Sequence, residues 1–180
     1  AINIPEGVLR IYDEAFSGCT ALLNITLPKS LKYLGSEVFQ GCSALTSIEL
    51  PDGLTNIRWG TFKDCSALTT INIPTTVTSI EDAFDGCTSL PVVDNIRYAD
   101  SYLIEMIDKA ASTCTIKPET RFIASSAFEN CENIKSVSLP NKLVTIGRAA
   151  FSGCSSLTTI TFPSTLKSIE EKAFNGCNFK

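Results

Sequence analysis

The residues with the greatest potential for chemistry are eight cysteines, in a chain of 180 residues that contains no histidine. Cysteine thiolates act as nucleophiles and as metal ligands, and thiols also pair into disulfides. Without histidine there is no Ser-His or Cys-His pair, no imidazole ligand and no side chain whose ordinary pKa lies near neutrality. The cysteines and the carboxylates are therefore the remaining candidates for chemistry.

Seven of the cysteines keep a regular spacing that favours a structural role. They lie at positions 19, 42, 65, 87, 131, 154 and 177, and no C-x-x-C pair occurs. Thiols stacked in register would be about 4.8 Å apart, whereas the Cβ atoms of a disulfide are about 3.8 Å apart. A straight row of thiols also offers no tetrahedron to zinc. We expect buried, reduced cysteines, with no bound metal and no cofactor.

The carboxylates and the overall charge exclude further classes of function. Glu81 with Asp82, and Glu170 with Glu171, are expected on a solvated surface, so the sequence predicts a protein that is not an enzyme. The net charge of −4 and the scattered lysines and arginines lack the basic stripe that nucleic acids require. No apolar run approaches the roughly 18 residues of a membrane span, so no membrane insertion is expected.

The whole chain repeats with a period of 23 residues, contracted once to 22. Phenylalanine precedes each of the seven spaced cysteines by three residues, and prolines recur at 5, 28, 51, 74, 140 and 163. The segment CSALTSIELPDGLTNIRWGTFKDC shows one unit: a short strand, a proline corner, a second extended piece and a tight turn that carries phenylalanine. Each unit therefore predicts one coil of a solenoid.

Stacked coils place equivalent apolar residues in continuous internal columns. The phenylalanines form one column. Two further columns consist of Leu22, Leu45, Leu68, Leu90, Ile134 and Leu157, and of Ile25, Ile48, Ile71, Val137 and Ile160.

The repeat resembles the BspA-like class of leucine-rich repeats, through L-P-x-x-L-x-x-I followed by A-F-x-G-C, as in Ala150-Phe151-Ser152-Gly153-Cys154. The resemblance implies a right-handed leucine-rich-repeat coil of α/β type, mostly β with turns, with about seven to eight repeats of 22–23 residues. We expect a single domain over 1–180, with regular repeats at 1–90 and 118–180, as part of a longer array. The family is similar to secreted and surface-exposed proteins of host-associated bacteria and some protists, where adhesion is the usual role.

An irregular repeat at 91–117 interrupts the pattern. Asn95–Tyr98 and Tyr102–Glu105 flank Ala99-Asp100-Ser101, which predicts a β-hairpin that protrudes from the solenoid. Two interpretations stay open: a tolerated variation of the repeat, or a recognition feature built on Tyr98 and Tyr102.

The outward positions of the strands are the first candidates for ligand binding, although a plain strand surface would look the same. They comprise Asn24, Thr26, Ser47, Glu49, Thr70, Asn72, Ser136, Ser138, Thr159 and Thr161. On the second extended segment, Trp59 beside Arg58 has the composition of a binding hot spot.

These observations favour a non-catalytic scaffold that binds a protein, as a cell-surface or secreted adhesin for host matrix or cell-surface proteins. Two other hypotheses are a structural spacer and a module that binds carbohydrates or small ligands. We also expect end-to-end self-association, because the terminal coils would expose their apolar columns.

Overall fold

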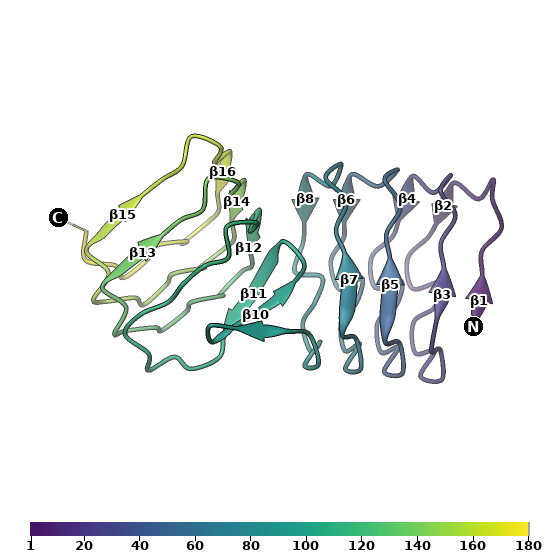
Figure 1. The fold of residues 1–180 in the computed structure, drawn as a ribbon, viewed down its shortest axis with the longest axis horizontal. Coiled ribbons are helices and arrows are strands. Elements are labelled where there is room, and N and C mark those ends of the chain that lie inside the picture. The colour runs from purple at the N-terminus through teal and green to yellow at the C-terminus, as the bar shows by residue number, and fades with distance from the viewer. Residues whose placement is uncertain (180) are drawn as a thin grey trace. The chain divides into compact units, whose positions relative to one another are not determined.

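The computed structural model describes residues 1–179 and divides into two compact units, unit 1 from Ala1 to Pro91 and unit 2 from Val92 onward. Strands and turns build both units, and no helix occurs among the described residues (Figure 1). Accordingly, no membrane-crossing helix is found in that part of the chain. The expected leucine-rich-repeat coil, mostly β with turns, is confirmed, and a short strand and a tight turn make up the second half of each repeat.

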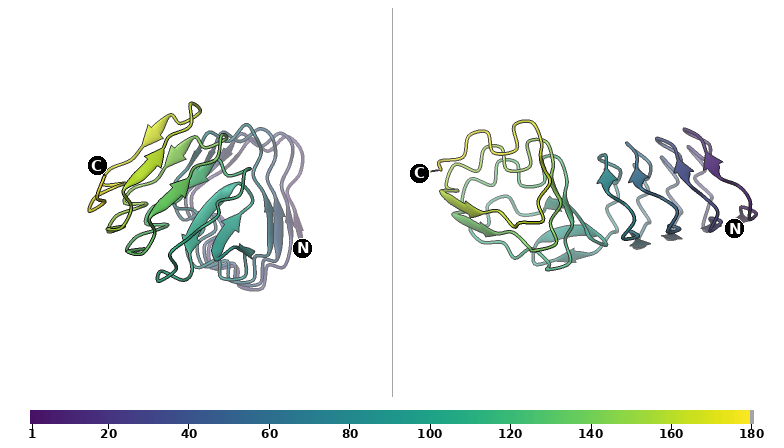
Figure 2. Two further views of the ribbon diagram at one scale, coloured as in Figure 1. Left: turned by 60° about the vertical axis from the view of Figure 1, so that its left-hand side comes forward. Right: turned by 90° about the horizontal axis from the view of Figure 1, so that it is seen from above.

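Unit 1 is a stack of coils in which strands pair two by two, in parallel, with the equivalent strand of a neighbouring coil (Figures 1 and 2). One row contains β1 (Ile2–Asn3), β3 (Ile25–Thr26), β5 (Ser47–Glu49) and β7 (Thr70–Asn72); the other contains β2 (Arg10–Ile11), β4 (Tyr33–Leu34), β6 (Asn56–Ile57) and β8 (Ser79–Ile80). Paired residues are one repeat apart in the sequence, as in Ile48 with Ile71. The solenoid that the period predicted is confirmed.

The core of each unit consists of the predicted columns. Leu45, Leu68 and Leu157 are fully buried, and the strand isoleucines Ile25, Ile48 and Ile71 are buried as well. The phenylalanine rings stack with interplanar angles of 10°, 14° and 9° in unit 1 and of 3° and 5° in unit 2. The ring centroids are 5.7, 5.6 and 5.3 Å apart from Phe16 to Phe84, and 4.7 and 5.2 Å apart from Phe128 to Phe174.

Unit 2 contains a six-stranded sheet and a two-stranded pair. The sheet comprises β9 (Val92–Val93), β10 (Ile96–Ala99), β11 (Tyr102–Met106), β12 (Phe122–Ile123), β14 (Thr145–Ile146) and β16 (Ser168–Ile169), and the pair comprises β13 (Ser136–Ser138) and β15 (Thr159–Thr161). Strands β10 and β11 pair antiparallel, which confirms the hairpin. Strand β11 then pairs in parallel with β12, through Tyr102 with Phe122 and Leu103 with Ile123.

The expectation that this hairpin protrudes is wrong. Strand β11 supplies the next rung of the ladder that β12, β14 and β16 continue, so the hairpin lies within the sheet. Its apolar side chains drive this placement, because exposing them to water would be unfavourable: Tyr98, Leu103 and Met106 are 1%, 0% and 0% exposed.

Met106 takes the position that phenylalanine holds in the other coils. Its backbone N–H donates to the carbonyl of Ala127 at 2.8 Å, as the N–H of Phe128 donates to the carbonyl of Ala150 at 2.7 Å. The Met106 sulfur also lies 3.6 Å from Cys131 Sγ. An unbranched thioether can fill an irregular gap, so the phenylalanine position of the irregular repeat stays filled without an aromatic ring there.

Candidate binding surfaces

Most of the cysteines pack as side chains of the core, whereas Cys19 is exposed and Cys114 and Cys177 are half-buried. All eight are free of disulfides, as expected, and five are buried. Five repeats use the thiol in the same way, as where Cys65 Sγ donates to the carbonyl of Phe39 at 3.1 Å and Cys154 Sγ donates to that of Phe128 at 3.1 Å. The turn that carries phenylalanine is thereby tied to the coil before it.

Burial also keeps the thiols of Cys42 and Cys154 protonated at neutral pH. Desolvation, reinforced by neighbouring cysteines, raises the pKa of Cys42 to about 11 and that of Cys154 to about 12. Because the thiolate is the nucleophile and the metal ligand, such thiols are poor in both roles at neutral pH. Within residues 1–179 there is also no group of three or more Cys, Asp and Glu side chains placed to hold a metal ion.

The predicted outward positions of the strands are all exposed, in both units. In unit 1, Ser47 pairs with Thr70 and Glu49 with Asn72 across β5 and β7. The side chain of Asn72 also stabilises the fold. Its Oδ1 accepts the N–H of Leu50 at 2.8 Å, and its Nδ2 donates to the carbonyl of Leu50 at 3.3 Å. Alternation along the strands thus places the candidate side chains in water and the isoleucines in the core.

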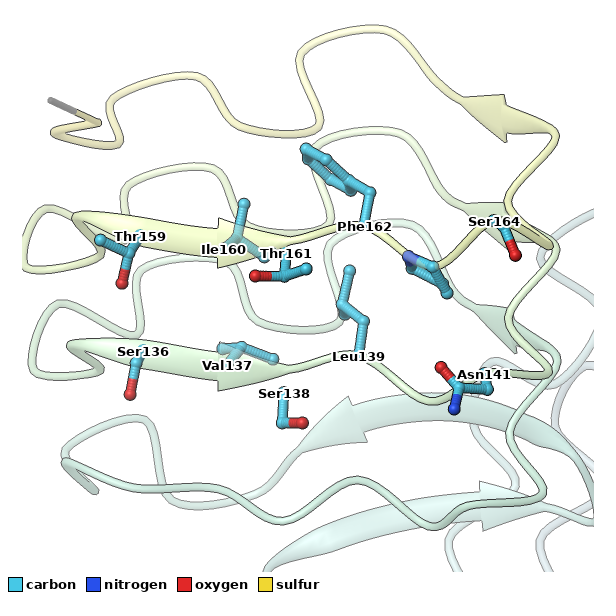
Figure 3. A pocket seen from close by; sticks show the side chains of 11 residues that line it. Ser136, Val137, Ser138, Leu139, Asn141, Thr159, Ile160, Thr161, Phe162 and Ser164 are labelled. Atoms are coloured by element: carbon cyan, nitrogen blue, oxygen red, sulfur yellow. The ribbon is translucent and has the colours of Figure 1, made fainter.

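In unit 2, four of the candidate residues line one depression. The pairs Ser136 with Thr159 and Ser138 with Thr161 lie side by side on β13 and β15. Figure 3 shows Ser136 and Ser138 on the side of β13 opposite Leu139. The depression has a volume of about 640 Å³, and its rim continues past the proline corner to Asn141 and Ser164.

Asn141 and Ser164 were not among the predicted site residues, although the sequence contained a signal for them. Each directly follows the corner proline of its repeat, so the two residues occupy equivalent positions in neighbouring coils. Both positions lie beyond the strand, to which the predicted outward positions were confined.

Arg58 and Trp59 lie on unit 1, where the turn follows β6. Trp59 is 48% exposed, and the ammonium group of Lys63 is 5.6 Å from its ring centroid. Arg58 is half-buried, with its guanidinium carbon 5.0 Å from the ring centroid of Tyr33. The predicted pair is therefore part of a larger group of aromatic and basic side chains.

Tyr98 and Tyr102 do not offer side chains to a ligand, which corrects that prediction. They are 1% and 2% exposed. The hydroxyl of Tyr98 accepts the backbone N–H of Lys117 at 3.2 Å, and the Lys117 ammonium group lies 4.4 Å from the Tyr98 ring centroid. Burial raises the pKa of Tyr98. The tyrosines are buried because the hairpin is a rung of the sheet, where these side chains face the core.

Comparison with known proteins assigns the repeat. The sequence profile described as the BspA type leucine rich repeat region matches six copies, over residues 1–117 and 121–180. The chain belongs to the BspA-type leucine-rich repeat family. Membership of this family, which the motif Ala-Phe-x-Gly-Cys had indicated, extends across the irregular segment up to residue 117.

Two solved structures of bacterial leucine-rich repeat proteins are similar to this BspA-type chain. A protein from Bacteroides ovatus is 31% identical, with a TM-score of 0.51, over 99% of this chain and 59% of its own. The leucine rich repeat protein of T. pallidum is 28% identical, with a TM-score of 0.56, over 93% of this chain and 71% of its own. The chain thus spans less than two thirds of the Bacteroides protein. No curated protein matches it significantly.

Proposed function

We propose that this protein is a non-catalytic scaffold that binds a protein partner, as an adhesin exposed on or secreted from a bacterial cell. The observation that carries the proposal is the row of exposed polar side chains held in register by a fully packed ladder, as in Ser138 beside Thr161. A rigid array of this kind loses little conformational entropy on binding. Membership of the BspA-type family supports the surface location.

The first test is surface-based binding of the chain to matrix proteins, serum glycoproteins and glycans. Ser138→Lys combined with Thr161→Lys places two bulky charges on the face of β13 and β15 without touching the core. The matched control is Ser155→Lys combined with Asn175→Lys, on exposed turns of the same unit. Saturable binding to a protein that only the first variant loses is the expected result; equal binding by both variants would refute a role for this face.

Carbohydrate binding is the second candidate function, and the depression in unit 2 is the observation that favours it. Its volume of about 640 Å³ falls in the usual range of small-ligand sites, and its lining contains five hydroxyl side chains and the amide of Asn141. This function would be favoured if the chain binds glycans but no protein, and if the variant with Ser138→Lys and Thr161→Lys loses the glycan binding. A chain that binds nothing in the panel would instead fit a structural spacer.

A further inference from the structure

The second row of strands in unit 1 carries a group of side chains that packing does not explain. We call it the aromatic–basic cluster; it consists of Arg10, Tyr12, Tyr33, Arg58, Trp59 and Lys63. Arg10 and Tyr33 are partners in the ladder of β2 and β4. Since β6 continues this row and Arg58 directly follows it, three successive coils contribute to the cluster.

The Tyr33 ring is the centre of the cluster. The guanidinium carbons of Arg10 and Arg58 lie 5.8 and 5.0 Å from its centroid, and the Tyr12 ring centroid lies 5.7 Å away. Both distances from the guanidinium carbons are within the range of cation–π attraction. Two long, flexible cations are therefore held against one ring before any ligand arrives, which reduces the entropy they would lose on binding.

Glycine in the middle coil allows the coil before it to pack closely. Gly35 is equivalent to Tyr12 and Arg58, because it follows Leu34 as Tyr12 follows Ile11 in the paired strands. A Cβ atom at Gly35 would lie 2.8 Å from the carbonyl carbon of Tyr12, so the chain tolerates no side chain there. Gly35 therefore contributes no side chain of its own between Tyr12 and Arg58.

The cluster is exposed, and its cations form no salt bridge among the described residues. Tyr12 and Trp59 are 64% and 48% exposed. Within the described residues no carboxylate lies within 4.0 Å of a charged nitrogen of Arg10, Arg58 or Lys63. This is the composition of an unfilled interface, since Trp, Tyr and Arg are the residues enriched at binding hot spots.

We propose that the aromatic–basic cluster binds an acidic, extended segment of the partner protein. Guanidinium groups recognise carboxylates with two parallel hydrogen bonds, and the exposed rings accept the apolar side chains between those carboxylates. Leu9, which is 55% exposed beside Arg10, adds aliphatic surface that suits a peptide better than a sulfated glycan. The inference rests on the proposed protein-binding function and names the chemistry of the partner.

Trp59 makes the test direct, because it is the only tryptophan in the chain. The probe is a peptide of alternating glutamate and leucine, titrated while Trp59 fluorescence is recorded; the same peptide with glutamine, and heparin, are the comparison ligands. We expect saturable binding of the glutamate peptide that weakens as salt is raised. Equal binding of the glutamine peptide, or binding of heparin alone, would overturn the proposal.

Matched variants locate the site. Arg10→Ala with Arg58→Ala should weaken binding of the glutamate peptide by about tenfold or more, as loss of hot-spot residues does. Arg10→Lys with Arg58→Lys keeps the charge but loses the planar guanidinium group. Its affinity for the glutamate peptide should lie between that of the unmodified chain and that of the double alanine variant. Lys29→Ala, an exposed cation outside the cluster, should leave the affinity unchanged. An unchanged affinity in the double alanine variant, with an unaltered melting curve, would refute the cluster as the site.

The same variants separate this inference from the proposed function. If the double alanine variant still binds its protein from the panel through the face of β13 and β15, the scaffold function stands and the inference fails. If the panel binding and the peptide binding are lost together in that variant, both are supported.

Discussion

Truncation of Phe62 tests the view that the stacked rings hold the solenoid together. Phe62 is fully buried between Phe39 and Phe84, with ring centroids 5.6 and 5.3 Å away. Replacing a buried phenylalanine by alanine costs about 3–5 kcal/mol. Two stacked neighbours, each worth about 0.5–1.5 kcal/mol beyond burial, place Phe62→Ala in the upper half of that range, at about 4–5 kcal/mol. This is a large part of the roughly 5–15 kcal/mol that stabilises a domain.

Two comparison variants make the ring contribution separable. Phe62→Leu keeps most of the apolar volume and loses the two ring contacts, so about 1–3 kcal/mol should be lost. Leu23→Ala removes an apolar side chain that is 55% exposed in the same unit, and its effect should stay within about 0.5 kcal/mol. Urea unfolding followed by Trp59 fluorescence measures all three variants in unit 1.

The result that would refute this reasoning is a Phe62→Ala variant that loses less than about 2 kcal/mol, or no more than Leu23→Ala does. Hydrogen exchange adds a spatial check. In a solenoid each coil contacts only its neighbours, so protection should fall first in the coils next to residue 62.

Three further predictions concern unit 2. Met106→Phe restores the residue type of the phenylalanine column, and thermal melting should show that the free energy of unfolding changes by less than about 1.5 kcal/mol. A larger loss of stability would contradict the equivalence of position 106 with the phenylalanine positions. Tyr98→Phe removes only the hydroxyl that accepts the N–H of Lys117, so it should cost about 1 kcal/mol without changing any binding; altered binding would show that Tyr98 reaches a ligand after all. Burial raises the pKa of Cys154 from its ordinary 9.0 to about 12, so the unfolded chain ionises first and the free energy of unfolding should decline between pH 9 and pH 12. Cys154→Ala should show a shallower decline in denaturant titrations across that range, and an identical slope would exclude the thiol as a cause.

The period of the sequence determined most of the fold. The recurrence of Phe, Cys, Pro and Leu at fixed intervals predicted the coil, the columns, the free cysteines and the exposed strand positions, and the structure confirms them. These features follow from local pattern, because each coil repeats the same contacts with its neighbours.

The tertiary structure alone decided how the irregular segment packs. From sequence, the segment from 91 to 117 could be a protruding hairpin, since its strands and turn were visible but its pairing with β12 was not. That pairing buries Tyr98 and Tyr102, and it makes Met106 the equivalent of a phenylalanine. The aromatic–basic cluster likewise needs coordinates, because Arg10, Tyr33 and Arg58 come from three coils and meet only when those coils stack. Repetition in the sequence determines which residues face the core and which face the solvent. Contacts between non-equivalent positions of neighbouring coils depend instead on the length and direction of the side chains, and the period does not encode these.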